Sequence, residues 1–262
     1  MLLTIDAGNT NTVFALIDSH DIVEQWRIST GDQRTVDEYM VWISNLMALS
    51  GRSPETVSGA IIASVVPQVV WPLTQLCKKY FGCEPLVVGD ENVDLGVDIQ
   101  VTNPREVGAD RLVNAVAGHA LYGGPLIVVD FGTATTFDIV GADGAYLGGV
   151  ICPGINLSLR ALHLAAAKLP RIAVEAPKEG KAVTGKTTQE AMQSGVFWGY
   201  VSMIEGLVAR LKAEHGGNMK VLATGGLAPV FANRTNAIDE VAGEMTLQGL
   251  RLIFERNRPD AG

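Results

Sequence analysis

The stretch LLTIDAGNTNTVFALID, residues 2–18, joins two apolar runs through a short polar turn. The first run ends in Asp6, and Gly8 then permits a tight hairpin whose backbone N–H groups can approach an anion closely. A third run, IVEQWRI, follows after the turn signal SHD. Apolar or alternating runs separated by turns are typical of strands. The segment therefore predicts a three-stranded meander with an aspartate at the end of its first strand.

The same plan returns at LIVVDFGTATTFDIV, residues 126–140, which is followed by GAYLGGVI. An offset of 124 residues aligns Asp6 with Asp130 and Gly8 with Gly132, and it also places Thr12 on Thr136. We therefore expect a duplicated α/β chain with halves at residues 1–116 and 117–262. One aspartate–glycine turn is a commonplace hairpin. Two in matching places predict a cleft with phosphate-binding turns on both walls and a carboxylate able to organise Mg²⁺.

Between and after the two meanders, apolar residues recur at helical spacing, and further short apolar runs indicate strands. Asp110 stands near the start of one helical segment, GADRLVNAVAGHAL. The predicted helices cover about 35–49, 68–81, 108–121, 156–168 and 187–213, with a further helix at the end of the chain, and the added strands cover 85–89 and 220–224.

The composition excludes several classes of protein. The 262 residues include 28 acidic and 20 basic side chains, a net charge of −8, so no broad basic face is expected for nucleic acid or an anionic membrane. No apolar stretch is long enough to span a membrane, and the first residues lack the basic segment of a signal peptide. The three cysteines lack metal-ligand spacing. We therefore expect a cytoplasmic protein without a nucleic-acid or membrane partner.

The stretch EGKAVTGKTT, residues 179–188, contains the phosphate-loop pattern G-x-x-x-x-G-K-[ST] at Gly180–Thr187. A phosphate loop leaves a buried strand directly and enters a helix. Here the only candidate strand is RIAVE, and APKE intervenes with a proline that does not suit a strand end. We therefore expect GKTT to cap the following helix rather than to bind ATP, although its residues can still contact substrate.

Several motifs stand in a fixed order along the chain: IDAGNTNT at 5–12, NPREVGADR at 103–111, DFGTATTFD at 130–138, PGI at 153–155, GKTTQEAMQSG at 185–195 and ATGG at 223–226. Taken together and in this order, they resemble type III pantothenate kinases over essentially the whole chain. GADR between two aspartate–glycine turns is the most restrictive of them, because D-x-G-T is shared across the actin, sugar-kinase and Hsp70 superfamily.

This resemblance implies an actin-like ATPase fold of two ribonuclease-H-like halves with mixed sheets and a cleft between them. It also implies transfer of the ATP γ-phosphoryl group to pantothenate, the first step of coenzyme A synthesis, by a homodimer with a shared active site. The implied cofactors are ATP, Mg²⁺ and a monovalent cation, K⁺ or NH₄⁺. By matching position, Asp110 is the general base, Asp130 helps to bind the monovalent cation, and Asp6 lies near Mg²⁺ through water.

The resemblance also assigns the binding residues. ATGG would lie near adenosine. The implied ATP-phosphate contacts are Asp6, Ala7, Gly8, Asn9, Thr10, Asn11, Thr12 and Val13 in the first half and Thr133 in the second. The implied pantothenate contacts are Gly108, Ala109, Asp110 and Arg111, with Thr188 supplied by the partner subunit.

Chemical reasoning agrees with these roles. Phosphoryl transfer needs positioning, charge neutralisation and a carboxylate that accepts the proton of the attacking hydroxyl. At the start of a helix, Asp110 is expected to be favoured in its ionised form, and Arg111 can fork onto a carboxylate or phosphate. By themselves, however, Asp110 is also consistent with a plain helix cap and Arg111 with a surface ion pair. We leave the role of Asp138 open between stabilising its hairpin and supporting the cation site.

One position departs from the family pattern. Val101 stands two residues before Asn-Pro, where many members carry a tyrosine close to pantothenate.

Two alternative functions stay open: a kinase for another small hydroxyl substrate such as a sugar, and an ATP-binding regulatory protein of the same fold. GADR argues against the first. A general base argues against the second, because a pure binder has no use for one.

Overall fold

The computed structural model describes residues 1–31, 33–165, 169–178 and 180–258, and these form two compact units. The first unit contains Met1–Leu121 together with Glu244–Gly262, and the second contains Tyr122–Gly243. The boundary proposed from the sequence at residue 116 falls inside a helix, before this change of unit. The C-terminal helix packs with the first unit, whereas the proposed division grouped it with the second half.

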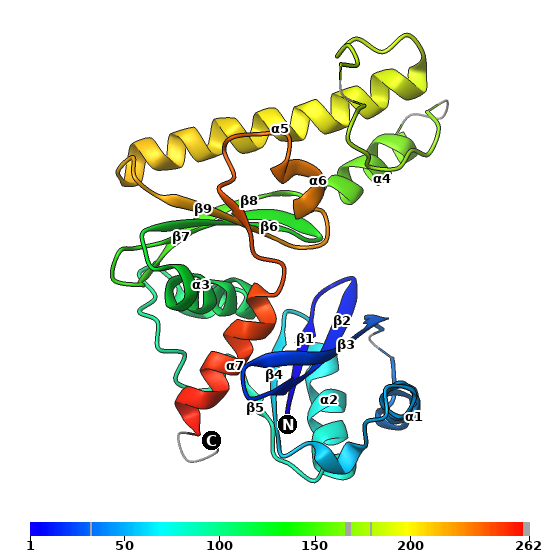
Figure 1. Cartoon of the computed structure of the whole chain (residues 1–262), viewed down its shortest axis with the longest axis vertical. Coiled ribbons are helices and arrows are strands. Elements are labelled where there is room, and N and C mark those ends of the chain that lie inside the picture. The colour runs from blue at the N-terminus through cyan, green and yellow to red at the C-terminus, as the bar shows by residue number, and fades with distance from the viewer. Residues whose placement is uncertain (32, 166–168, 179, 259–262) are drawn as a thin grey trace. The chain divides into compact units, whose positions relative to one another are not determined.

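The first unit is built on a mixed five-stranded sheet with the strand order β3-β2-β1-β4-β5 (Figure 1). The first three strands form the predicted antiparallel meander, while β4 runs parallel to β1 and β5 parallel to β4. The strands are β1 (Leu2–Ala7), β2 (Asn11–Asp18), β3 (Asp21–Ser29), β4 (Gly59–Ser64) and β5 (Leu86–Val87).

Two pairs of helices supply the apolar cores of the first unit. Helices α1 and α2 pack with Leu3, Ile5 and their neighbours, while α3 and α7 pack with Ile61 and Ala63. Helix α1 begins with a capping box, because Thr35 and Glu38 satisfy one another's backbone N–H groups. The helices are α1 (Val36–Leu49), α2 (Pro67–Tyr80), α3 (Ala109–Tyr122) and α7 (Met245–Asn257), with short 3₁₀ turns at Pro54–Thr56 and Pro104–Glu106.

The second unit repeats the topology of the first. Its sheet has the order β10-β9-β6-β7-β8, so β6, β7, β8, β9 and β10 occupy the same places as β1, β2, β3, β4 and β5. This agreement confirms the duplication that the sequence predicts. The strands are β6 (Leu126–Phe131), β7 (Ala134–Val140), β8 (Tyr146–Pro153), β9 (Lys220–Thr224) and β10 (Glu240–Val241).

Helices α4 (Ile155–Ala165), α5 (Thr188–His215) and α6 (Ala228–Ala232) complete the second unit. Figure 1 shows α5 as the long helix that runs across the sheet. Its side chains Phe197, Val201 and Ile204 are buried in one core with the strands. The predicted helices and strands are therefore present with small shifts at their ends, and the end of the predicted helix at 166–168 lies outside the described residues.

Candidate active site

The first predicted phosphate turn joins β1 to β2. Asp6 lies near the end of the central strand β1, opposite Val13 on one side and Ala63 on the other. The backbone N–H of Gly8 donates to the carbonyl oxygen of Asn11 at 3.0 Å and closes the turn. Ala7 and Thr12 are buried, and Val13 is partly buried. The three residues at the tip, Asn9, Thr10 and Asn11, are exposed. The turn thus offers its backbone at the end of a rigid strand.

The second turn joins β6 to β7 and is closed in a similar way. Asp130 lies opposite Thr136 and Thr224 on the flanking strands, and the N–H of Gly132 donates to the carbonyl of Ala134 at 3.0 Å. Thr133 is exposed at the tip. The strand pairing therefore places both aspartates at equivalent points of two equivalent hairpins.

The second turn is one residue shorter than the first. The constant offset of 124 residues, which places Thr12 on Thr136, is therefore wrong beyond the glycines. Ala7 pairs with Thr12, and the equivalent Phe131 pairs with Thr135, not with Thr136. Thr12 and Thr135 are both buried, as equivalent strand positions should be. A constant offset could not detect the missing residue, because the sequence around both turns is rich in threonine.

Two glycines from distant segments approach the second turn. A Cβ on Gly154 would overlap the carbonyl of Thr133, and the N–H of Gly154 donates to that same oxygen at 3.1 Å. Gly225 has φ +89°, and a Cβ there would lie 2.7 Å from Asp130 Oδ1 and 2.7 Å from the carbonyl oxygen of Phe131. The motifs PGI and ATGG thus contain glycine because backbone packs directly on the turn.

The surroundings of Asp130 fit a hard monovalent cation in their donor chemistry. Asp130 Oδ1 and the Phe131 carbonyl oxygen lie near one another beside Gly225, and oxygen is the ligand that hard cations prefer. Among the described residues, no three His, Cys, Asp or Glu side chains gather into a metal-binding group. The oxygens near Asp130 would therefore have to be completed by backbone, solvent or ligand.

Asp138 is a buried carboxylate in β7. It accepts hydrogen bonds from the Tyr146 hydroxyl at 2.8 Å and from the Thr136 hydroxyl at 3.0 Å. Its exposed fraction is 0%. These contacts tie β7 to the start of β8, so the observed part of its role is to stabilise the meander that carries Asp130.

The segment Gly108–Arg111 forms the start of α3. Asp110 Oδ1 accepts the N–H of Arg111 at 2.8 Å and lies 2.6 Å from the place that a Cβ on Gly108 would take. Ala109 and Arg111 are partly buried beside it. Glycine at position 108 is therefore needed for the carboxylate to fold back over the helix start.

Burial raises the pKa of Asp110 above its ordinary value of 3.8, while the N–H and the guanidinium of Arg111 oppose that change. The favourable electrostatics expected at the helix start are thus present but smaller than the effect of burial. A carboxylate with a raised pKa is a stronger base than an exposed one, which suits proton abstraction.

Within the first unit, the helix start and the first phosphate turn are neighbours. A Cβ on Gly108 would lie 3.5 Å from Val65 Cγ1, and the N–H of Val65 donates to the carbonyl of Ala7 at 3.1 Å. Val65 is thus hydrogen-bonded to the strand end of Asp6 and lies close to the segment of Asp110. The structure brings together two motifs that lie about a hundred residues apart in the chain.

Thr188 is the first residue of α5 and is exposed, with Thr187 as the N-cap. The Thr187 hydroxyl accepts the N–H of Glu190 at 3.2 Å, and Lys186 N–H donates to the Glu190 carboxylate at 2.9 Å. A Cβ on Gly185 would collide with the backbone at Glu190. No strand enters this motif within 169–178 or 180–187, and Glu179 lies outside the described residues. The GKTT stretch is therefore a helix cap, as predicted.

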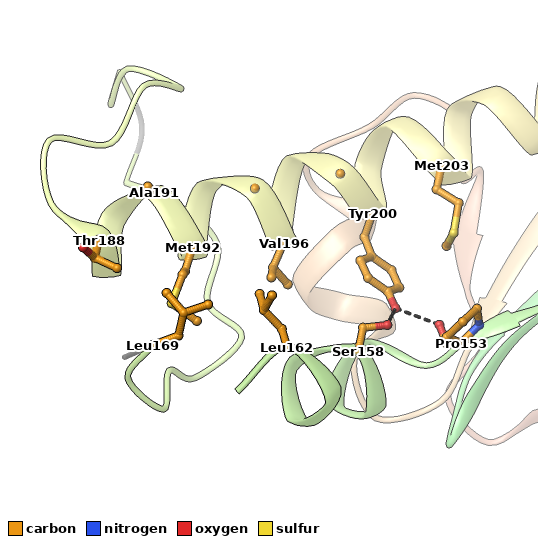
Figure 2. Close-up of a pocket in the computed structure, with 12 residues that line it drawn as sticks. Pro153, Ser158, Leu162, Leu169, Thr188, Ala191, Met192, Val196, Tyr200 and Met203 are labelled. Atoms are coloured by element: carbon orange, nitrogen blue, oxygen red, sulfur yellow. Dashed lines mark hydrogen bonds between the residues drawn. The ribbon is translucent and has the colours of Figure 1, made fainter. Parts of the chain in front are cut away.

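Thr188 also lines a pocket of about 660 Å³ between α4 and α5, which Figure 2 shows. Most of the lining is apolar, with Leu162 and Met192 among the side chains that point into it. At the polar end, the Tyr200 hydroxyl donates to the carbonyl of Pro153 at 2.7 Å and lies 2.7 Å from the Ser158 hydroxyl. This contact anchors the residue before Gly154, and hence the support of the second turn.

Together, the duplicated five-stranded sheets and the paired aspartate–glycine turns define the actin-like ATPase class of fold. Solved structures agree. The activator of the 2-hydroxyisocaproyl-CoA dehydratase from Clostridium difficile, with bound ADPNP, has a TM-score of 0.56 at 11% identity, with 98% of this chain and 96% of that one covered. The inorganic polyphosphate/ATP-glucomannokinase from Arthrobacter sp. strain KM has a TM-score of 0.50 at 15% identity, with 97% and 98% covered.

A sequence model of type III pantothenate kinases matches residues 2–210. The type III pantothenate kinase of Paramagnetospirillum magneticum is 60% identical over 98% of both chains. That of Caulobacter vibrioides is 55% identical over the same share of each. The chain belongs to the type III pantothenate kinase family. Among its described residues, no helix is both long enough and apolar enough to cross a membrane.

Proposed function

We propose that the chain transfers the γ-phosphoryl group of ATP to the terminal hydroxyl of pantothenate, forming 4′-phosphopantothenate in the first step of coenzyme A synthesis. The single observation that carries this proposal, beside family membership, is the position of Val65: its N–H donates to the carbonyl of Ala7, and its Cγ1 lies 3.5 Å from the place that a Cβ on Gly108 would take. It places the Asp110 segment next to the Asp6 turn. A base beside a phosphate-binding turn is the arrangement that phosphoryl transfer requires.

In this proposal the two turns hold ATP. Residues Asp6–Val13 bind its phosphates through backbone N–H groups and the polar side chains at the tip, and Thr133 adds a contact from the second turn. Asp6 holds Mg²⁺ through water, and Asp130 helps to bind K⁺ or NH₄⁺. The cations supply neutralisation of the charge that spreads over the transferred group. The Phe131 carbonyl oxygen, which lies beside the Asp130 carboxylate at Gly225, supports this assignment.

Asp110 acts as the general base. Its carboxylate accepts the proton of the pantothenate hydroxyl as that oxygen attacks phosphorus, and its raised pKa favours this step. Arg111 pairs with the pantothenate carboxylate, because a guanidinium binds a carboxylate through two parallel hydrogen bonds. Gly108 and Ala109 complete the wall of the pantothenate site.

We further propose a cytoplasmic homodimer in which Thr188 of each subunit contacts pantothenate in the other. Large apolar side chains on α4 and in the segment before α5 support an interface on this side of the second unit. Leu164 is 76% exposed and Val183 61% exposed. Helix α4 also exposes Leu157 and Leu162, and several large apolar side chains exposed on one helix are typical of a protein interface.

The first test is ADP release by the purified protein with Mg²⁺ and K⁺, with and without pantothenate. We expect pantothenate to be required and the Asp110→Asn variant to lose most of the activity. Nucleotide binding without stimulation by pantothenate would refute the assignment and favour another hydroxyl substrate or a regulatory role. If the site is shared, a mixture of Asp110→Asn and Thr188→Ala chains should recover part of the activity, whereas either variant alone should not.

A further inference from the structure

Thr30 makes contact with the first phosphate turn although it belongs to no motif described above. It is the residue that follows β3, whose last residue, Ser29, pairs with Asn11 at the start of β2. The meander therefore carries Thr30 back to the level of the turn tip. Its side chain is partly buried there.

Three hydrogen bonds join Thr30 to the turn. Its hydroxyl donates to the carbonyl of Gly8 at 2.7 Å, and its backbone N–H donates to the carbonyl of Thr10 at 3.0 Å. The hydroxyl oxygen also lies 2.9 Å from the Thr12 hydroxyl. A hydroxyl has one proton, and that of Thr30 is given to Gly8, so Thr12 is the donor in this last contact. The result is a continuous chain from Thr12 through Thr30 to Gly8.

Thr30 controls the orientation of two peptide groups at the turn, because its hydroxyl holds the carbonyl of Gly8 and its backbone N–H holds the carbonyl of Thr10. In a trans peptide the C=O of one residue and the N–H of the next point in opposite directions within one plane. Holding the carbonyls of Gly8 and Thr10 therefore also sets the directions of the N–H groups of Asn9 and Asn11. These are the exposed residues whose backbone a phosphate would meet.

We propose that Thr30 is a positioning residue that holds the first turn in the shape that binds ATP phosphates; this rests on the proposed function of that turn. Without the hydroxyl, the Gly8 carbonyl loses its partner and the turn samples other peptide orientations. ATP then binds only the fraction of molecules with the correct turn, so its apparent affinity falls by that fraction. Loss of the Thr30 hydroxyl should therefore weaken the binding of ATP and leave the binding of pantothenate unchanged.

The test compares Thr30→Val, which keeps the branched shape but removes the hydroxyl, with Thr30→Ser, which keeps the hydroxyl. We expect the valine variant to bind Mg·ATP about tenfold more weakly by titration calorimetry, with the same rise in KM for ATP and an unchanged KM for pantothenate. The serine variant should stay within about twofold of the wild type. Thr4→Val is the matched control, because the buried Thr4 hydroxyl donates at 3.4 Å to Ala15, away from the turn.

Each result decides the matter. Unchanged ATP affinity in Thr30→Val, an equal loss in Thr4→Val, or failure of Thr30→Ser to restore binding would overturn the role of Thr30. If the wild type binds ATP but releases no ADP on addition of pantothenate, the proposed function fails instead. A selective loss in Thr30→Val would then still support the role of this residue at an ATP-binding turn.

Discussion

Gly225 offers the sharpest test of how the second turn is supported. It lies just after β9 with φ +89°, a conformation that costs a residue with a side chain about 1–2 kcal/mol. In Gly225→Ala, the new Cβ would also lie 2.7 Å from both Asp130 Oδ1 and the Phe131 carbonyl oxygen. The neighbour at Phe131 is strand backbone, which cannot rotate away as the end of a flexible side chain can.

The cost of the positive φ and the cost of crowding by the new Cβ can be added to give an order of magnitude. Forcing an extra carbon into a packed site typically costs about 1–3 kcal/mol, so the sum for Gly225→Ala is about 2–5 kcal/mol of unfolding free energy. With a urea dependence of about 2 kcal/mol per molar, the unfolding midpoint should fall by about 1–2.5 M. If Asp130 helps to bind a monovalent cation, the K⁺ concentration needed for half-maximal activation should rise as well.

Gly226→Ala is the matched control, since no atom lies within 4 Å of its added Cβ. Its stability should change by less than about 1 kcal/mol in either direction. Urea unfolding followed by fluorescence and circular dichroism measures both variants under one set of conditions. Equal midpoints for the two variants, or a wild-type midpoint for Gly225→Ala, would refute the argument that this close approach supports the turn.

Four further predictions concern Asp110, Gly154 and Tyr146. Asp110→Asn should lower kcat about 10²–10⁴-fold without lowering urea stability, because burial raises the pKa of Asp110 and makes its charge costly above that pKa. Because burial raises the pKa of Asp110, kcat/KM of the wild type should fall on the acidic side of its pH profile with an apparent pKa above 3.8. An apparent pKa at or below 3.8 would contradict the role of Asp110 as the base. Gly154→Ala should lose about 1–3 kcal/mol and raise KM for ATP, since its Cβ overlaps the Thr133 carbonyl; an unchanged KM and stability would count against this. Tyr146→Phe should cost about 1.5–3 kcal/mol in urea unfolding at neutral pH by removing a donor to buried Asp138, and a loss below about 0.5 kcal/mol would disagree.

Much of the fold could be predicted because its signals are local. Each meander combines apolar strands with a glycine turn, and Thr35 and Thr187 cap their helices through contacts three residues away. The same locality explains why the sequence alone predicts that GKTT caps the helix that follows it. The family motifs then pointed to Asp6, Asp110 and the remaining proposed site residues, whose functional roles stay predictions.

The sequence by itself determined the two meanders, the position of an aspartate at the end of each first strand, and the family. Only the tertiary structure decided that the second turn is one residue shorter, that the C-terminal helix joins the first unit, and that Thr30 and Gly225 support the turns. The physical reason is the sequence separation over which each kind of interaction acts. Strand periodicity, turns and caps act over a few residues, whereas these contacts depend on how strands align and how closely distant segments of backbone approach one another.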